Sequence, residues 1–194
     1  MSQQRTEHHC HAGMANPTQT LKDEHELILQ ALEALERKVA AIQAGATPDP
    51  AYFEKAVEFL RTFADRCHHG KEEDLLFKRM AERGFPVQGG PIAVMLHEHE
   101  MGRAYIRGIA EGAGKIRTDS TAAAQIVENA QGYIMLLRNH ISKENTILFP
   151  MADQALAPED QDALRDAFAK FETETMGPGV HEAMHKLLEE LKAA

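Results

Sequence analysis

The chain has 194 residues, of which 43% are hydrophobic, 26% charged and 6% aromatic, and its formal net charge is −9. This length suits one domain with a sizeable core. The acidic balance, without a basic patch, argues against nucleic acids and anionic membranes as partners. Two cysteines cannot form a disulfide framework, and no apolar run approaches the length of a membrane span. The polar N-terminus lacks a signal-peptide pattern, so these features predict a soluble cytoplasmic protein.

Glycine- and proline-rich stretches divide the chain. Residues 1–17 read as a polar flexible tail, residues 18–154 as a bundle, and residues 155–194 as a helical C-terminal extension. The bundle contains four amphipathic stretches, at residues 18–44, 50–83, 91–111 and 119–154. None of them alternates with the period of a β-strand. Short connections between four such helices predict an all-α, up-down-up-down four-helix bundle, and the extension should break at residues 177–179.

Two ten-residue stretches are near copies of each other: HHGKEEDLLF, which begins at His68, and HISKENTILF, which begins at His140. Each carries a histidine and a glutamate four residues apart, the glutamates being Glu72 and Glu144. On an α-helix this spacing places an imidazole and a carboxylate on one face, one turn apart. Each pair is half of a metal site, so the two copies predict a dinuclear site.

Helical phase, at about 100° per residue, adds two further histidines. On the first helix, His25 shares its face with the apolar residues. On the third helix His99 does the same, whereas His97 falls nearly opposite. On the fourth helix, His140 and Glu144 lie in the middle of the apolar face. We therefore expect these side chains to point into the core.

The second helix is less regular. His68 and Glu72 lie at the margin of its apolar stripe, whereas His69 and Glu73 are expected to point away from it. The register of the repeat also selects the first pair. The candidate metal ligands are therefore His25, His68, Glu72, His99, His140 and Glu144.

These candidate ligands combine imidazole and carboxylate without thiolate, a set that suits iron, manganese or zinc. Buried ionisable groups need partners or a metal, and this set is too large for one ordinary zinc site. We expect a pair of ions, bridged by the two carboxylates and by an oxo or hydroxo group. Such a pair keeps positions open for a small ligand, which is typical of a reactive site rather than a structural one.

Four motifs occur in order along the chain: EH at Glu24–His25, HxxKEE from His68, EHExG from Glu98 and HxxKENxxLFP from His140. This order resembles the hemerythrin-like, HHE cation-binding family, and the likeness covers about residues 18–154. The resemblance implies a four-helix bundle around a non-haem di-iron centre. It also implies the same set of ligands, with Glu72 and Glu144 bridging two iron ions per chain.

The chain departs from oxygen-carrying hemerythrins at one position. Those proteins place two histidines four residues apart on the third helix, where this chain has His99 and Arg103. The remaining ligand set is more similar to di-iron proteins linked to iron–sulfur cluster repair under nitrosative stress. The extension beyond residue 155 and the lack of the N-terminal cysteine motif of those proteins separate the chain from them as well.

The sequence thus favours a non-haem di-iron protein that binds or senses O2, NO or peroxide. One alternative is a di-iron enzyme or iron donor in peroxide removal or iron–sulfur cluster repair. Another is a bundle that stores or binds iron without ligand chemistry. The residues do not decide between catalysis and binding, nor do they predict an oligomeric state.

Other residues allow two interpretations each. The tail could be disordered or could chelate a soft metal through His8, His9, Cys10 and His11. His181 and His185, one turn apart, indicate a docked C-terminal helix or a second metal site. Tyr133 shares the phase of His140 and is either a core residue or a hydrogen-bond donor to the metals. Cys67 is either a small buried residue or a redox-active thiol.

Overall fold

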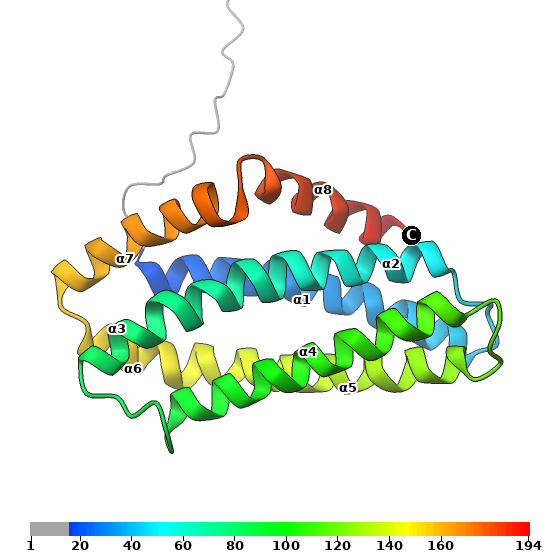
Figure 1. Ribbon diagram of the computed structural model, residues 1–194, viewed down its shortest axis with the longest axis horizontal. Helices are drawn as coiled ribbons and strands as arrows, with labels where there is room; N and C mark the ends of the chain where they lie inside the picture. Colours follow the sequence, from blue (N-terminus) through cyan, green and yellow to red (C-terminus); the bar gives the residue numbers. More distant parts are fainter. Residues whose placement is uncertain (1–15) are drawn as a thin grey trace, which may run out of the picture.

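The computed structural model describes residues 16–194, which are helical apart from short connections. Four long helices lie side by side, and further helices pack along one side of them (Figure 1). The first long helix is α1 (Pro17–Gln43) and the third is α4 (Pro91–Lys115). The prediction of an all-α bundle with additional C-terminal helices is confirmed.

The second and fourth long helices change their winding along their length. The second is built from α2 (Pro50–Phe59), η1 (Leu60–His69), η2 (Glu72–Leu76) and α3 (Phe77–Glu82). The fourth is built from α5 (Ala122–Lys143), η3 (Glu144–Leu148) and α6 (Phe149–Ala155). The η segments are π-helical, with wider turns closed by i→i+5 hydrogen bonds. In both helices the π-helical winding falls on a copy of the sequence repeat.

Proline and a capping side chain start the first two long helices. Pro17 and Pro50 occupy first-turn positions, where a missing N–H costs nothing and the fixed φ is already helical. The side chains of Asn16 and Asp49 accept hydrogen bonds from backbone N–H groups of these first turns. The helix boundaries are therefore set by local sequence.

The C-terminal extension folds back along the bundle. It consists of α7 (Pro158–Lys170), η4 (Phe171–Met176) and α8 (Val180–Ala193). Gly177 and Gly179 have φ values of 97° and 79°, which glycine adopts without a steric penalty, so the chain can turn between η4 and α8. α8 packs against α1 and α2 through Met184, Leu187, Leu188 and Leu191.

Two hydrophobic clusters fill the bundle, with polar residues between them. On α1, Leu21 belongs to one cluster and Ile28 to the other, and His25 lies between them. On the fourth long helix, Ile141 and Leu148 belong to the two clusters in the same way. The buried polar residues are therefore enclosed by apolar side chains toward both ends of the bundle.

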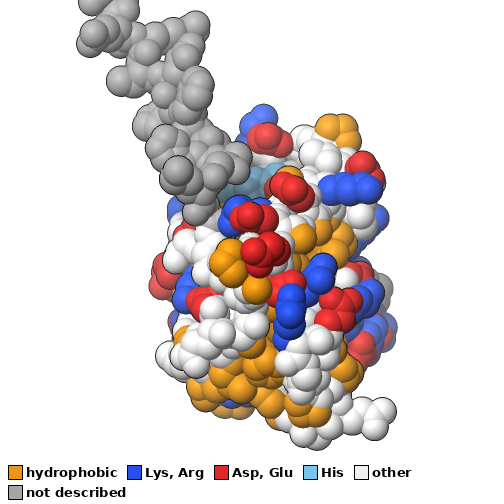
Figure 2. All heavy atoms as spheres, turned by 90° about the vertical axis from the view of Figure 1, so that its left-hand side faces the viewer, with side chains coloured by type: hydrophobic (Ala, Val, Ile, Leu, Met, Phe, Trp, Pro, Cys, Tyr) orange, Lys and Arg blue, Asp and Glu red, His pale blue; other side chains and the backbone are white. Residues whose placement is uncertain are grey.

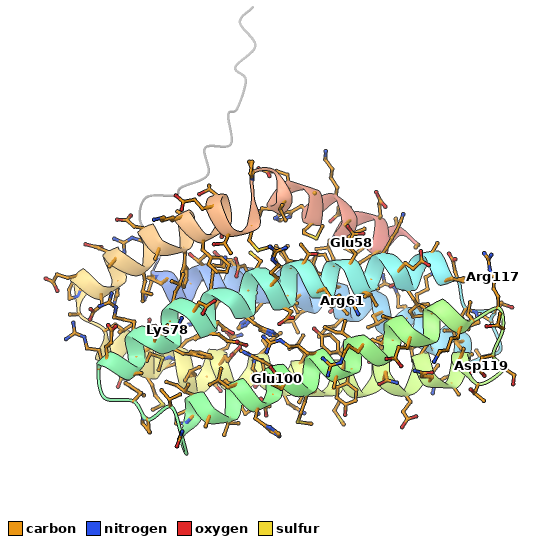
Figure 3. All side chains as sticks on the ribbon, viewed as in Figure 1. Glu58, Arg61, Lys78, Glu100, Arg117 and Asp119 are labelled. Atoms are coloured by element: carbon orange, nitrogen blue, oxygen red, sulfur yellow. The ribbon has the colours of Figure 1, made fainter. Side chains whose placement is uncertain are left out.

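The outer surface carries charges of both signs. Figure 3 labels Glu58, Arg61, Lys78 and Glu100 along the outside of the second and third long helices, and all four are exposed. The end of the molecule near α3, α6 and α7 mixes acidic, basic and hydrophobic side chains (Figure 2). Among the helices of residues 16–194, none combines the length and the apolar character of a membrane span.

Candidate metal centre

The structure brings the six predicted ligands together inside the bundle. Each is at most 1% exposed: His25, His68, Glu72, His99, His140 and Glu144. Within the described part of the chain, three groups of potential ligands have donor atoms within 4.8 Å of one another. One consists of Glu24, Cys67 and Glu172, whose two carboxylates accept from the ammonium of Lys71. The other two share Glu72. The two-histidine group consists of His25, His68, Glu72 and Glu144. The three-histidine group consists of His69, His99, His140 and Glu72.

His69 is the residue that the sequence prediction missed. It was expected to point away from the core, but it is only 3% exposed, so that expectation is wrong. Its ring stacks on that of His99, with centroids 3.9 Å apart and planes 14° apart. The cause is the π-helical winding of η1. A wider turn rotates less per residue than an α-helix, so the consecutive residues His68 and His69 both face inward.

Glu144 faces both groups. Its Oε1 lies 3.0 Å from Nε2 of His140, and its Oε2 lies 3.1 Å from Nε2 of His25. Burial alone would raise the pKa of Glu144, but His140 and His25 hold this pKa well below its usual range. Conversely, burial opposes protonation of both imidazoles, yet Glu144 raises the pKa of each above its ordinary value. The ionised carboxylate thus attracts positive charge from both sides.

Glu72 also lies between the groups. Its Oε1 is 3.6 Å from Nε2 of His68, and its Oε2 is 3.4 Å from Nε2 of His99. Burial and the negative charge of Glu144 raise the pKa of Glu72 well above its ordinary value. A cation between two buried carboxylates would relieve this repulsion. The electrostatics of the interior therefore favour a bound cation.

Hydrogen bonds around the cluster orient four of the imidazoles. Nδ1 of His68 donates to Glu24 at 2.9 Å, and Nδ1 of His140 donates to Glu98 at 2.9 Å. Nδ1 of His99 donates to Glu73 at 2.7 Å, and Nδ1 of His25 donates to the side-chain oxygen of Asn145 at 2.9 Å. An ionised carboxylate and an amide oxygen only accept, so each of these Nδ1 atoms carries a proton and Nε2 is the ring atom directed toward the cluster. Nε2 of His99 and Nε2 of His140 consequently face each other at 3.1 Å. Two imidazole nitrogens at this distance need a proton or a metal ion between them.

Two histidines resist protonation. Burial and the neighbouring His25 lower the pKa of His68 well below its ordinary value. Burial and the neighbouring His99 lower the pKa of His69 to about 3. Neutral imidazole is the form that binds a metal, so both side chains are ready to act as ligands at neutral pH.

Unpaired polar atoms concentrate in this cluster. The buried atoms without a hydrogen-bond partner among residues 16–194 include Nε2 of His25 and His68, both ring nitrogens of His69, and both carboxylate oxygens of Glu72 and Glu144. Beyond these, only the hydroxyls of Tyr52 and Tyr133 belong to the same class. Unpaired burial of polar groups is costly. The orphaned atoms and the imidazole–carboxylate chemistry both fit a bound iron, manganese or zinc ion.

The sequence repeat builds two similar halves. The first repeat copy supplies His68, Lys71, Glu72 and Glu73, and the second supplies His140, Lys143, Glu144 and Asn145. In each copy, the histidine Nδ1 and the lysine Nζ share one glutamate from the preceding long helix. This glutamate is Glu24 for the first copy and Glu98 for the second. The EH and EHE sequence motifs contain these two glutamates, but their contacts with histidine and lysine are seen only in the structure.

Arg103 occupies the position where oxygen-carrying hemerythrins have their additional histidine. Its guanidinium donates to Asp65 at 2.8 Å and to Glu73 at 2.6 Å. Glu73 contacts His99, and Oδ1 of Asp65 lies 3.5 Å from Nδ1 of His69. Arg103 therefore holds the two carboxylates that face the three-histidine group, while His69 supplies the additional imidazole from another helix.

The remaining candidates lie outside the cluster. Tyr133 is fully buried and its ring lies beside Gly102, without a hydrogen bond from its hydroxyl to any described residue. His181 and His185 lie on α8 with ring centroids 4.7 Å apart, and both rings lie near Phe63. Neither belongs to a group of three potential ligands in the described chain. His8, His9, Cys10 and His11 lie outside the described residues.

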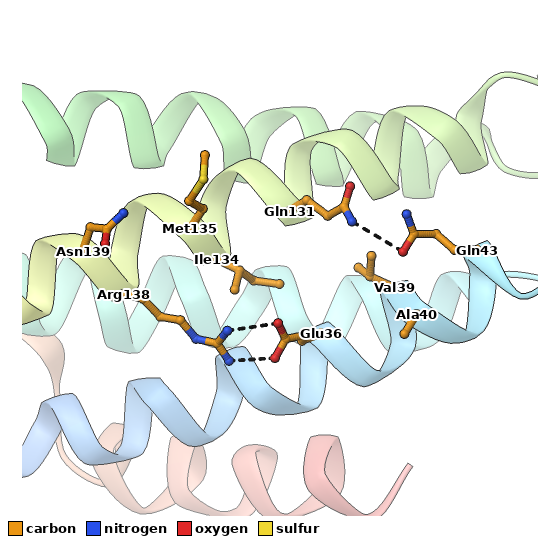
Figure 4. A pocket seen from close by; sticks show the side chains of 9 residues that line it. All are labelled: Glu36, Val39, Ala40, Gln43, Gln131, Ile134, Met135, Arg138 and Asn139. Carbon is orange, nitrogen blue, oxygen red and sulfur yellow. Dashed lines mark hydrogen bonds and ion pairs between the residues drawn. The ribbon is translucent and has the colours of Figure 1, made fainter.

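The surface groove between α1 and α5 is separate from this cluster. It encloses about 540 Å³, and Figure 4 shows its lining residues. Arg138 makes a two-pronged contact to Glu36 across this groove, at 3.0 and 2.7 Å. None of the clustered histidines and glutamates lines this groove. It therefore gives no access to the candidate metal centre.

Comparison with known proteins agrees with this geometry. No curated protein matches the chain. Residues 16–152 match the family described as "Hemerythrin HHE cation binding domain". This range contains all of the clustered histidines and glutamates, and it ends before α7. Because the match covers most of the chain, the protein belongs to the hemerythrin HHE cation-binding family.

Proposed function

We propose that the protein is a non-haem di-iron protein that binds or senses a small ligand, namely O2, NO or peroxide. One observation carries this proposal: five buried histidines and two buried glutamates gather in two adjacent groups, and both glutamates and three of the histidines keep buried polar atoms without a hydrogen-bond partner. The two groups share Glu72, so they suit a pair of ions better than one. Membership of a cation-binding family supports the same conclusion.

The two groups differ in what they offer a metal. The two-histidine group and the three-histidine group would each hold one ion, with Glu72 and Glu144 spanning both. Iron in such a site supplies a redox-active Lewis acid that binds small oxygen- or nitrogen-containing ligands. The two-histidine group has one imidazole fewer, so it leaves more room for an exogenous ligand.

The surroundings select for small ligands. The ring of Phe149 stacks on His25 with centroids 5.5 Å apart, and the ring of Phe77 lies 6.1 Å from that of His99. These aromatic rings and the two hydrophobic clusters limit the access of water and of bulky molecules. A surface pocket of about 480 Å³ reaches Asp65 and Glu73, but none of the seven clustered residues lines it. This pocket therefore gives an organic substrate no direct route to the cluster.

Metal analysis of protein loaded with iron under anaerobic conditions tests the proposal. We expect two iron ions per chain. A content of one zinc ion and no iron per chain would contradict the di-iron assignment, because this cluster would then serve as a closed structural site.

Optical spectra after separate exposure to O2, NO and peroxide then identify the chemistry. A stable oxygen adduct or rapid nitrosylation would support binding or sensing. Turnover of peroxide, or transfer of iron to a damaged iron–sulfur protein, would instead favour the enzyme or iron-donor alternative. Retention of iron without any ligand-dependent spectral change would favour storage.

A further inference from the structure

A buried lysine connects the C-terminal extension to the candidate metal centre. Lys71 lies between η1 and η2 and is fully buried. Its Nζ donates to Oε1 of Glu24 and, at 2.7 Å, to Oε1 of Glu172 on η4. The other oxygen of Glu24 accepts from Nδ1 of His68 at 2.9 Å. An unbroken series of contacts therefore runs from the extension to an imidazole of the two-histidine group.

The packing around Lys71 fixes this series in place. A Cβ atom at Gly70 would lie 2.8 Å from Cζ of Phe171, so the phenylalanine ring rests directly on the backbone next to Lys71. Nζ of Lys71 also lies 5.7 Å from the centroid of the Phe168 ring. Glycine at position 70 is thus what allows η4 to approach the second long helix and bring Glu172 to Lys71.

The charges explain why a second carboxylate is needed. Burial alone would lower the pKa of Lys71, but Glu24 raises it, with further contributions that include Glu172, so the ammonium stays charged. Glu24 must neutralise this ammonium and also hold the imidazole of His68. Glu172 also accepts from this ammonium and shares its charge, so Glu24 can accept the hydrogen bond from His68 as well.

We propose that Glu172 is a positioning residue for the metal centre. Through Lys71 and Glu24 it fixes the ring orientation and the Nδ1–H tautomer of His68. The C-terminal extension, which lies beyond the residues that match the family, thereby controls metal retention by the two-histidine group. This inference rests on the proposed metal centre and deepens it.

Anaerobic titration of the metal-free protein with Fe(II) tests the inference in the variant Glu172→Gln. The Glu172 side chain is 32% exposed, so an isosteric amide fits without disturbing the fold. Loss of an outer hydrogen-bonding partner typically weakens metal binding by about ten- to a hundredfold. We expect this loss for one of the two binding steps, with the other step unchanged.

Glu174→Gln provides the matched control. Glu174 lies on the same η4 segment, its side chain is 66% exposed, and its nearest cation is Lys170 at 3.7 Å. It should bind both ions like the unmodified protein. Equal affinities in all three proteins, or equal losses in both variants, would overturn the inference.

A second measurement needs no metal. NMR of the metal-free, histidine-labelled protein reports the Nδ1 proton of His68, which the hydrogen bond to Glu24 protects from exchange with water. Exchange should accelerate in Glu172→Gln and stay unchanged in Glu174→Gln. Unchanged exchange in both variants would refute the positioning role. Failure of iron loading with accelerated exchange would refute the di-iron proposal alone.

Discussion

The two copies of the sequence repeat form similar contacts in different surroundings. In the first copy, Lys71 is completely buried beneath the C-terminal extension. In the second, Lys143 makes the equivalent contact with Glu98, but its side chain is 37% exposed. The same local sequence thus gives a sealed half and a half that remains partly open to water.

A second difference concerns the residue after each repeat histidine. In the first copy it is His69, which turns inward and adds an imidazole to the three-histidine group. In the second copy it is Ile141, which joins a hydrophobic cluster. A duplicated motif therefore produces two unequal groups of potential metal ligands, because one residue and one covering segment differ between its copies.

The largest expected effect follows from removing a spanning carboxylate. Glu72→Ala and Glu144→Ala should each lose most of the bound metal, because both side chains face both groups. Metal content after iron loading and desalting measures this effect, and Glu128→Ala on the exposed face of α5 is the control. If either variant kept one tightly bound ion, the two-histidine and three-histidine groups would bind metal independently. Glu72 and Glu144 would then not span both groups.

The two lysines should differ strongly in their contribution to stability. Lys71→Met leaves Glu24 buried without its ammonium partner, a change that typically costs about 3–5 kcal/mol. Lys143→Met breaks a partly exposed pair, for which at most about 1 kcal/mol is expected. Urea unfolding of the metal-free variants measures both values. Equal losses would show that the sealing of the first half has no energetic consequence.

Most of the fold was predictable because its signals are local. Prolines and capping residues start the helices, and apolar stripes define their inner faces. The third long helix was expected to end near residue 111, but α4 continues to Lys115. Gly112 lies inside α4, although a glycine at this position is typical of a helix end. A Cβ there would lie 2.7 Å from Cγ1 of Ile126, so the glycine permits close helix packing and does not break the helix. A glycine that breaks a helix and one that permits such contact look alike in a sequence.

The site was only partly predictable, for a similar reason. The spacing of His68 and Glu72 relies on local geometry and was readable from the repeat. The inward turn of His69 depends on π-helical winding, which α-helical phase cannot reveal. The contact between Lys71 and Glu172 joins residues about a hundred positions apart, so only the packing of the extension shows it.

The unequal histidine number can be tested by making the first copy resemble the second. His69→Ile should weaken metal binding in the three-histidine group by at least about tenfold, since even loss of an outer partner has that effect. The metal-free variant should be no less stable than the parent, because an apolar side chain replaces a buried, unpaired imidazole. Fe(II) titration and urea unfolding provide the two measurements. His97→Ile, at an exposed site on α4, should leave metal binding unchanged. Loss of stability without loss of affinity would indicate that His69 is only a packing residue.

The smallest expected effect concerns Glu73 and Asn145, which occupy equivalent positions in the two repeat copies. Glu73 accepts a hydrogen bond from Nδ1 of His99, and Asn145 accepts one from Nδ1 of His25. Burial alone would raise the pKa of Glu73, but hydrogen bonds from His99 and Arg103 lower it to about 2, from an ordinary value of 4.5. A lowered pKa stabilises the folded state above the unfolded value, and this contribution disappears as the pH falls from 4.5 toward about 2.

Replacing Glu73 by Gln should therefore lower the stability of the metal-free protein by about 1 kcal/mol at neutral pH. The deficit relative to the parent should shrink steadily through the acid window, because the parent loses the same interaction as its carboxylate becomes protonated. The neutral amide of Asn145 has no such titration, so Asn145→Ala should show a deficit that does not change across this window. Urea unfolding over a pH series measures both. A constant deficit for Glu73→Gln would mean that His99 and Arg103 do not hold the Glu73 carboxylate in solution. The difference between a charged acceptor in one repeat copy and a neutral acceptor in the other would then have no effect on stability.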